Sequence, residues 1–147
     1  MPTAMDRIQS RPWLAAAIGA ILLWGAFPPL GLFWLAPLAM VPWLALVDRE
    51  ESLVRKDILQ IWLVSCGLWL GLLQGIRLAY WPLYAGWFAL SIYIAVYLPL
   101  FIGLARIAVH RYRVPLAIAA PVIWVGLELI RGYFVTGFST CLLAHTQ

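Results

Sequence analysis

The segment from Ala120 to Ser139 reads APVIWVGLELIRGYFVTGFS, an apolar helix that carries two charges near its end. Glu128 and Arg131 stand three residues apart, close to one helical turn, so their side chains are expected on the same face. Ionisable groups inside a membrane span are costly, and those that occur usually face protein or water. Two interpretations remain open: a functional pair that faces the interior, or an ion pair that reaches the membrane interface.

The composition places the chain among integral membrane proteins. Of its 147 residues, 65% are hydrophobic and only 11% are charged, which is too much apolar surface for a water-soluble domain of this size. The net charge of +4 arises from basic residues in the connections between apolar runs. That distribution indicates membrane orientation, so we expect no binding to nucleic acid.

The apolar runs predict an all-α fold with about five transmembrane helices, since a helix crosses a bilayer in roughly 20 residues. The expected helices cover residues 13–27, 30–47, 58–76, 85–105 and 115–131. The first two are separated by Phe27-Pro28-Pro29 and are expected to form a short hairpin. The membrane domain is thus expected over residues 13–131, after an N-terminal segment at 1–12 and before a loop at 132–147.

The distribution of lysine and arginine predicts the orientation. A cytoplasmic N-terminus would leave only Arg77 and Arg131 outside among the 10 basic residues. The basic residues on the cytoplasmic side would be Arg7, Arg11, Arg49, Arg55, Lys56, Arg106, Arg111 and Arg113. We therefore expect a multi-pass protein of a bacterial inner membrane. Its Glu128–Arg131 pair should lie at the outer face, beside the Phe27 turn and the connection at 77–84.

The remaining motifs indicate packing more than chemistry. Gly67, Gly71 and Gly75 recur every four residues, which predicts a helix face that admits a close neighbour. Cys66 and Cys141 have neither disulfide nor metal-ligand spacing. Cys141 with His145 is a minor candidate for a nucleophile and its base. We predict no catalytic residue, no metal site and no cofactor, because phosphate-binding glycine loops, Ser-His-Asp arrangements and ligand clusters are missing from the sequence.

The C-terminal stretch resembles the bacterial apolipoprotein N-acyltransferase family. That family's pattern reads Pro-x-x-Trp-x-x-x-Glu-x-x-Arg-Gly, followed by Thr-Gly-Phe-Pro-Trp and Gly-x-Ser-Gln. The matching residues are Pro121, Trp124, Glu128, Arg131, Gly132, Thr136, Gly137, Phe138 and Gln147. Upstream, Ala26-Phe27-Pro28-Pro29 with Gly31 and the segment from Gly71 to Ile76 are similar to two further family signatures. The resemblance extends over essentially the whole chain.

The resemblance implies a function and its partners. The family transfers an acyl chain from a membrane phospholipid to the N-terminal cysteine amine of a diacylated lipoprotein. The resemblance also implies that the residues that bind substrate are Glu128, Arg131, Gly137 and Phe138. Of these, Arg131 suits a lipid phosphate, because a guanidinium matches phosphate geometry with two hydrogen bonds.

Two departures from the family shape the expectation. Ser139-Thr140 stands where the family has Pro-Trp, and the sequence stops before the nitrilase-like domain that carries the family's Glu-Lys-Cys triad. We therefore expect a truncated membrane domain that is inactive by itself. A second interpretation is a non-catalytic membrane scaffold, or a degenerate remnant, that binds lipid or a partner. A third is a small transporter subunit, which would need a path lined by polar groups that the last three apolar runs hardly offer.

Overall fold

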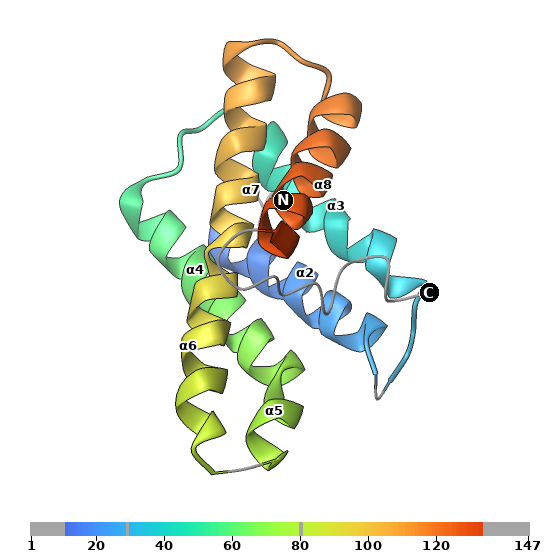
Figure 1. Cartoon of the computed structure of the whole chain (residues 1–147). Coiled ribbons are helices and arrows are strands. Elements are labelled where there is room, and N and C mark those ends of the chain that lie inside the picture. Colours follow the sequence, from blue (N-terminus) through green and yellow to red (C-terminus); the bar gives the residue numbers. More distant parts are fainter. Residues whose placement is uncertain (1–10, 29, 80, 134–147) are drawn as a thin grey trace.

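The computed structural model describes residues 11–28, 30–79 and 81–133, and within these ranges every regular element is a helix. The all-α prediction is therefore confirmed. The elements are α2 (Pro12–Ala26), α3 (Leu35–Asp48), α4 (Arg55–Leu72), α5 (Gln74–Ala79), α6 (Leu83–Ala95), α7 (Tyr97–Arg106), a short π-helical turn η1 (Ile107–Arg111) and α8 (Leu116–Tyr133). In Figure 1, α6 and α7 form one long rod, α8 returns beside α7, and α2 lies across the middle of the bundle.

Two helical segments of the described chain are long and apolar enough to cross a membrane by length and composition. One is the continuous Leu83–Arg111 segment of 29 residues, and the other is α8 with 18 residues. The apolar helices α2 and α3 are shorter, with 15 and 14 residues. At 1.5 Å per residue, each rises only about 20 Å, less than a hydrocarbon core of ~30 Å. Five membrane crossings thus stay a prediction.

The second helix begins at Leu35, whereas the sequence predicted a helix from residue 30. The chain first turns back on itself, because the Leu32 N–H donates to the Gly25 carbonyl at 3.1 Å. Gly31 takes a positive φ of 62° in this turn, a conformation that glycine adopts without steric penalty. After it, α3 packs along α2.

The third apolar run forms two helices, α4 and α5, where the sequence predicted one over residues 58–76. Helix α4 begins at Arg55, and the Asp57 carboxylate accepts a hydrogen bond from the Val54 N–H at 3.1 Å. The glycine prediction is right for Gly71, where an added Cβ would lie 3.2 Å from Trp24 Nε1. It is wrong for Gly67, which faces open space, and for Gly75, which lies in α5 beyond the break.

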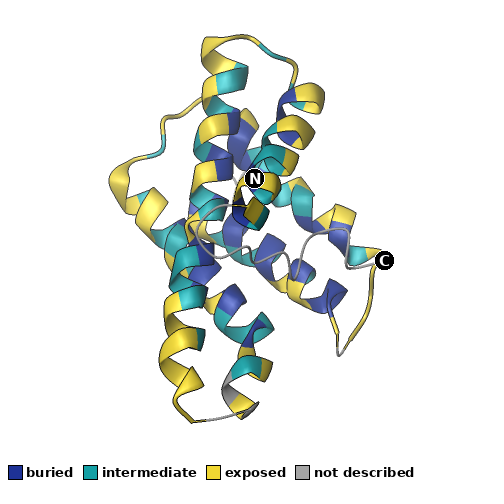
Figure 2. Ribbon diagram, in the orientation of Figure 1, coloured by how far each residue is buried: buried dark blue, intermediate teal, exposed yellow. Residues whose placement is uncertain are grey.

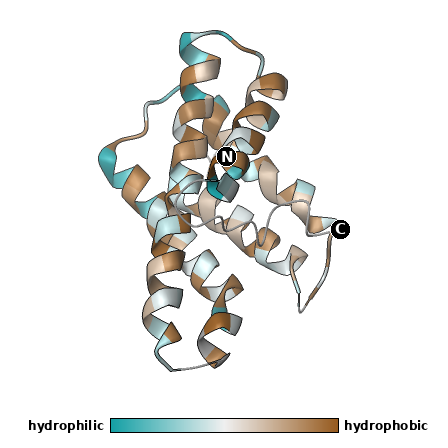
Figure 3. Ribbon diagram, viewed as in Figure 1, coloured by the Kyte–Doolittle hydropathy of each residue, from teal (hydrophilic) through white to brown (hydrophobic). Residues whose placement is uncertain are grey.

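The core gathers where α2, α3, α7 and α8 meet (Figure 2). The Trp43 indole donates to the Ala16 carbonyl at 3.3 Å and stacks on Trp124, with ring centroids 5.9 Å apart. Phe101 meets Trp124 edge-on at 5.0 Å. Large apolar residues such as Ile21 and Val122 are also exposed on the helices. Hydrophobic residues occur along all of the helices in Figure 3. Such a surface is expected of helices that face lipid.

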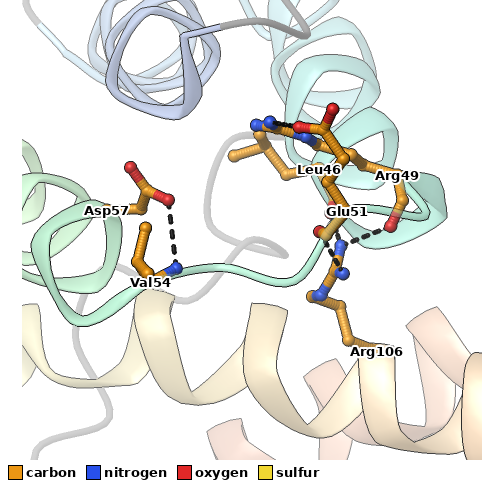
Figure 4. A network of polar contacts seen from close by, with 6 residues as sticks. All are labelled: Leu46, Arg49, Glu51, Val54, Asp57 and Arg106. Carbon is orange, nitrogen blue, oxygen red and sulfur yellow. Dashed lines mark hydrogen bonds and ion pairs between the residues drawn. The ribbon is translucent and has the colours of Figure 1, made fainter.

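Arg106, the last residue of α7, binds the end of α3 and the connection that follows it (Figure 4). Its guanidinium donates to the carbonyls of Leu46, Arg49 and Glu51, each at 2.7 Å. His110 Nε2 donates to the Val47 carbonyl at 2.8 Å. The last carbonyls of a helix have no partner within it and carry partial negative charge, so the Arg106 cation and the His110 donor stabilise this end of α3. The sequence predicted only an orientation signal here.

Candidate functional site

Glu128 and Arg131 both line a cavity of about 40 Å³ between α2, α3, α4, α7 and α8. The three-residue spacing therefore does bring the two side chains to one space, as expected for one helix face. Most of the lining is apolar and aromatic: Leu23, Phe27, Trp43, Leu68, Trp69, Leu98, Trp124 and Leu127. The polar members besides the pair are Ser65 and Tyr97. A few polar groups in an apolar cavity are typical of a ligand site.

The Arg131 side chain is buried inside the bundle. Its residue is only 5% exposed, although it stands in the last turn of α8. The guanidinium carbon lies 5.4 Å from the centroid of the Trp69 ring, within the range of a cation–π interaction. This geometry favours the interpretation in which the pair faces the interior over the one in which it reaches the membrane interface.

The cavity lies halfway along the longest helical segment. Tyr97 lines the cavity and stands fourteen residues from each end of Leu83–Arg111. The Tyr97 hydroxyl is held by that of Tyr93, with the two oxygens 2.8 Å apart. Of the three features expected to converge, Phe27 shares the cavity with Arg131, whereas the connection between α5 and α6 lies at the far end of α6.

Two polar groups of the cavity were not predicted as site residues, although Trp124 matches the family pattern. Ser65 is fully buried, and neither its Oγ nor the buried Nε1 of Trp124 has a hydrogen-bond partner among the described residues. Trp124 precedes Glu128 by four residues and Arg131 by seven, a spacing that places all three on one helix face. That spacing is the signal that would have added Trp124 to the site. For Ser65 the only local signal is its place one turn before Trp69.

None of the other residues named from the sequence adds a described side chain to the cavity. Gly137, Phe138, Cys141 and His145 lie outside the described residues. Cys66 is a free, buried thiol that packs in a second apolar cluster and does not line the cavity. Among the described residues, no group of three or more His, Cys, Asp or Glu side chains is placed to hold a metal ion.

Comparison with known proteins identifies relatives that match most of the chain. Residues 19–147 match the family model described as Apolipoprotein N-acyltransferase N-terminal domain. A protein named Apolipoprotein N-acyltransferase from Rhodopirellula baltica is 41% identical over 145 residues, which are 90% of this chain and 25% of the relative. A second protein of that name, from Geobacter metallireducens, is 30% identical over 150 residues, covering 97% of this chain and 28% of the relative.

The chain thus spans about a quarter of the length of these curated relatives. No solved structure matches it.

Proposed function

Because the chain belongs to the apolipoprotein N-acyltransferase N-terminal domain family, we propose that it is a membrane domain that holds the phospholipid donor for lipoprotein N-acylation. In this reaction an acyl chain passes from the phospholipid to the N-terminal cysteine amine of a diacylated lipoprotein. The observation that carries the proposal is a buried arginine in a largely apolar cavity. A phospholipid has the matching chemistry, an anionic phosphate next to aliphatic chains.

In the proposed complex, Arg131 binds the lipid phosphate. A guanidinium presents two parallel N–H groups to phosphate oxygens, and its hydrogen bonds to an anion are stronger than those between neutral groups. Glu128, half-buried one turn earlier, orients the guanidinium. Trp69 holds its position by the cation–π contact. Gly137 and Phe138 would complete the substrate site from the segment that follows α8, a role suggested by the family pattern.

We further propose that the domain crosses a bacterial inner membrane several times, with its N-terminus in the cytoplasm. The apolar outer surface and the two long apolar helices support a membrane location. The α3–α4 connection, which Arg106 contacts, and the basic segment after α7 would then face the cytoplasm, where lysine and arginine accumulate in membrane proteins.

A segment exchange tests the proposal. The matching segment of the Rhodopirellula baltica relative is replaced by this chain, and N-acylation of a diacylated lipopeptide is measured in phospholipid vesicles. We expect acylation above the background of empty vesicles, and a loss of at least about tenfold when the exchanged segment carries Arg131→Ala. Equal activity with Arg131→Ala would remove Arg131 from the site.

The alternative is a membrane scaffold that binds lipid without supporting catalysis. It is favoured by Ser139-Thr140, which replaces the Pro-Trp of the family pattern. The same exchange separates the two functions. A scaffold would bind phospholipid in an Arg131-dependent manner, yet the exchanged protein would remain inactive. Restoring Pro-Trp with Ser139→Pro and Thr140→Trp would recover acylation if those two positions alone are responsible.

A further inference from the structure

Two hydrogen-bond donors line the Arg131 cavity without a partner among the described residues. They are the Ser65 hydroxyl of α4 and the Trp124 indole N–H of α8. Buried polar groups are nearly always hydrogen-bonded, and an unpaired one destabilises the folded state. Two such groups in one cavity indicate a partner that comes from outside this part of the chain.

The chemistry of these donors defines the missing partner. An indole N–H only donates, and a serine hydroxyl can donate as well, so the atom that satisfies both is an acceptor oxygen. A carbonyl oxygen has two lone pairs and can accept both bonds. The apolar lining around the donors favours an oxygen that is attached to an aliphatic chain. An acyl ester combines these two features.

The position of the Trp124 donor is fixed before any ligand arrives. Its ring stacks on Trp43 at 5.9 Å and receives Phe101 edge-on at 5.0 Å, so the indole has little freedom to turn. Ser65 is held in the middle of α4 and is fully buried. Donors that are already ordered lose little entropy on binding, which strengthens recognition.

The cavity volume limits how much of the ligand enters. A space of about 40 Å³ exceeds the ~15 Å³ that one water molecule needs, but it is far below the volume of an acyl chain. It suits the ester group with its nearest carbons, or a few water molecules. Arg131 lines the same cavity, so a phosphate at the guanidinium and an ester in the cavity are compatible with one phospholipid.

We infer that Ser65 and Trp124 bind the ester carbonyl oxygen of an acylated lipid that enters the cavity beside Arg131. The inference rests on the proposed function and deepens it, because it assigns the lipid's ester to two residues. Two lipids carry this ester, a diacyl phospholipid and a diacylated lipopeptide, and only the first has a phosphate. The inference commits to the ester chemistry, and the lipid is identified by the arms of the test.

The test compares ester and ether lipids on the 147-residue chain. Native mass spectrometry measures the competition between a diester phospholipid, its diether analogue without carbonyl oxygens, and a diacylated lipopeptide. The variants are Ser65→Ala and Trp124→Phe. Ser91→Ala is the matched control, because Ser91 is also fully buried but already donates to the Trp87 carbonyl at 2.7 Å.

We expect the wild-type chain to prefer the diester over the diether by about tenfold, the effect of one or two hydrogen bonds. Ser65→Ala and Trp124→Phe should each weaken diester binding by roughly fivefold and leave diether binding unchanged. Ser91→Ala should leave the preference intact. Without lipid, Ser65→Ala should unfold at the same or a higher temperature, because it removes an unpaired hydroxyl.

Equal wild-type affinity for diester and diether would overturn the inference and leave only water in the cavity. A loss in Ser65→Ala that is the same for both lipids would assign Ser65 to packing and equally overturn it. Arg131→Ala distinguishes a failure of the proposed phosphate binding from a failure of the ester site. If phosphate binding is wrong but the ester site is right, Arg131→Ala leaves binding unchanged and the ester preference persists, most strongly for the lipopeptide.

Discussion

The guanidinium carbon of Arg131 in α8 lies 5.4 Å from the ring centroid of Trp69 in α4. An aromatic face thus holds a cation that is only 5% exposed. A buried charge is stable only where neighbouring groups compensate for the lost hydration, and an indole ring supplies part of that compensation. The contact also joins α4 to α8 at the cavity, so it links the stability of the bundle to the position of the candidate phosphate-binding group.

Replacing Trp69 should therefore affect both stability and lipid binding. Trp69→Leu removes the cation–π contact, and we expect the free energy of unfolding in detergent to fall by about 2 kcal/mol. Phospholipid affinity should fall with it, because Arg131 loses its orientation. Trp69→Phe keeps an aromatic face and should retain most of both properties.

Trp62→Leu is the matched control for the Trp69 variants. Trp62 lies on the same helix and is partly buried, but it does not line the cavity. Denaturation followed by circular dichroism and lipid competition by native mass spectrometry provide the two readouts. Full lipid affinity in Trp69→Leu would show that this ring has no part in placing Arg131.

The sequence predicts well which parts of the chain are helical, because each long apolar run contains a helix in the structure. It predicts their ends less well. Helix α3 begins five residues later than predicted, because the chain first forms a turn around Gly31 in which the Leu32 N–H donates to the Gly25 carbonyl. The break between α4 and α5 falls at Leu73, in a stretch without proline or charge that would have indicated it.

The candidate site, too, could be predicted from the sequence only in part. The i, i+3 spacing is a property of one helix, so it was sufficient to place Glu128 and Arg131 together. Whether Ser65 lines the cavity depends on how α4 is placed relative to α8, and its position one turn before Trp69 does not determine that placement. The sequence also could not predict that Arg131 is buried inside the bundle. Counting basic residues assigns a side of the membrane and not a distance from its surface.

Outside the cavity, Arg106 should be the cation whose substitution lowers the free energy of unfolding most. Arg106→Leu leaves the carbonyls of Leu46, Arg49 and Glu51 without their donor, and we expect a loss of about 3 kcal/mol in the free energy of unfolding. Arg106→Lys should recover only part of it, since an ammonium group lacks the planar fork of a guanidinium.

Arg111→Leu is the control for this end of the bundle, because Arg111 is exposed and only a few residues away. Thermal unfolding of the purified proteins measures all three variants. Similar losses for Arg106→Leu and Arg111→Leu would mean that net charge, and not the hydrogen bonds to α3, stabilises this end.

Substitution by alanine should have different effects on the free energy of unfolding at two glycines. A Cβ at Gly19 would lie 2.8 Å from the Ala39 carbonyl oxygen and would also overlap the Trp43 indole, so Gly19→Ala forces α2 and α3 apart. We expect a loss of about 1–3 kcal/mol, as for other overpacked cores. Gly67 lies in α4 and faces open space, so Gly67→Ala should be neutral or stabilise by up to about 1 kcal/mol. Chemical denaturation of both variants tests the pair, and stabilisation by Gly19→Ala would contradict the close packing of α2 on α3.

The proposed orientation predicts which connections can be labelled from outside the cell. Ser52 and Leu30 are both exposed and lie on opposite ends of α3, in the connections that precede α4 and follow α2. In a background with Cys66→Ala and Cys141→Ala, a membrane-impermeant maleimide should modify Leu30→Cys in spheroplasts. It should modify Ser52→Cys only after the inner membrane is permeabilised, because the basic connections are placed in the cytoplasm. Labelling of Ser52→Cys in intact spheroplasts would reverse the orientation. Labelling of both cysteines there would instead show that α3 does not cross the membrane, which is a direct question for a helix of 14 residues.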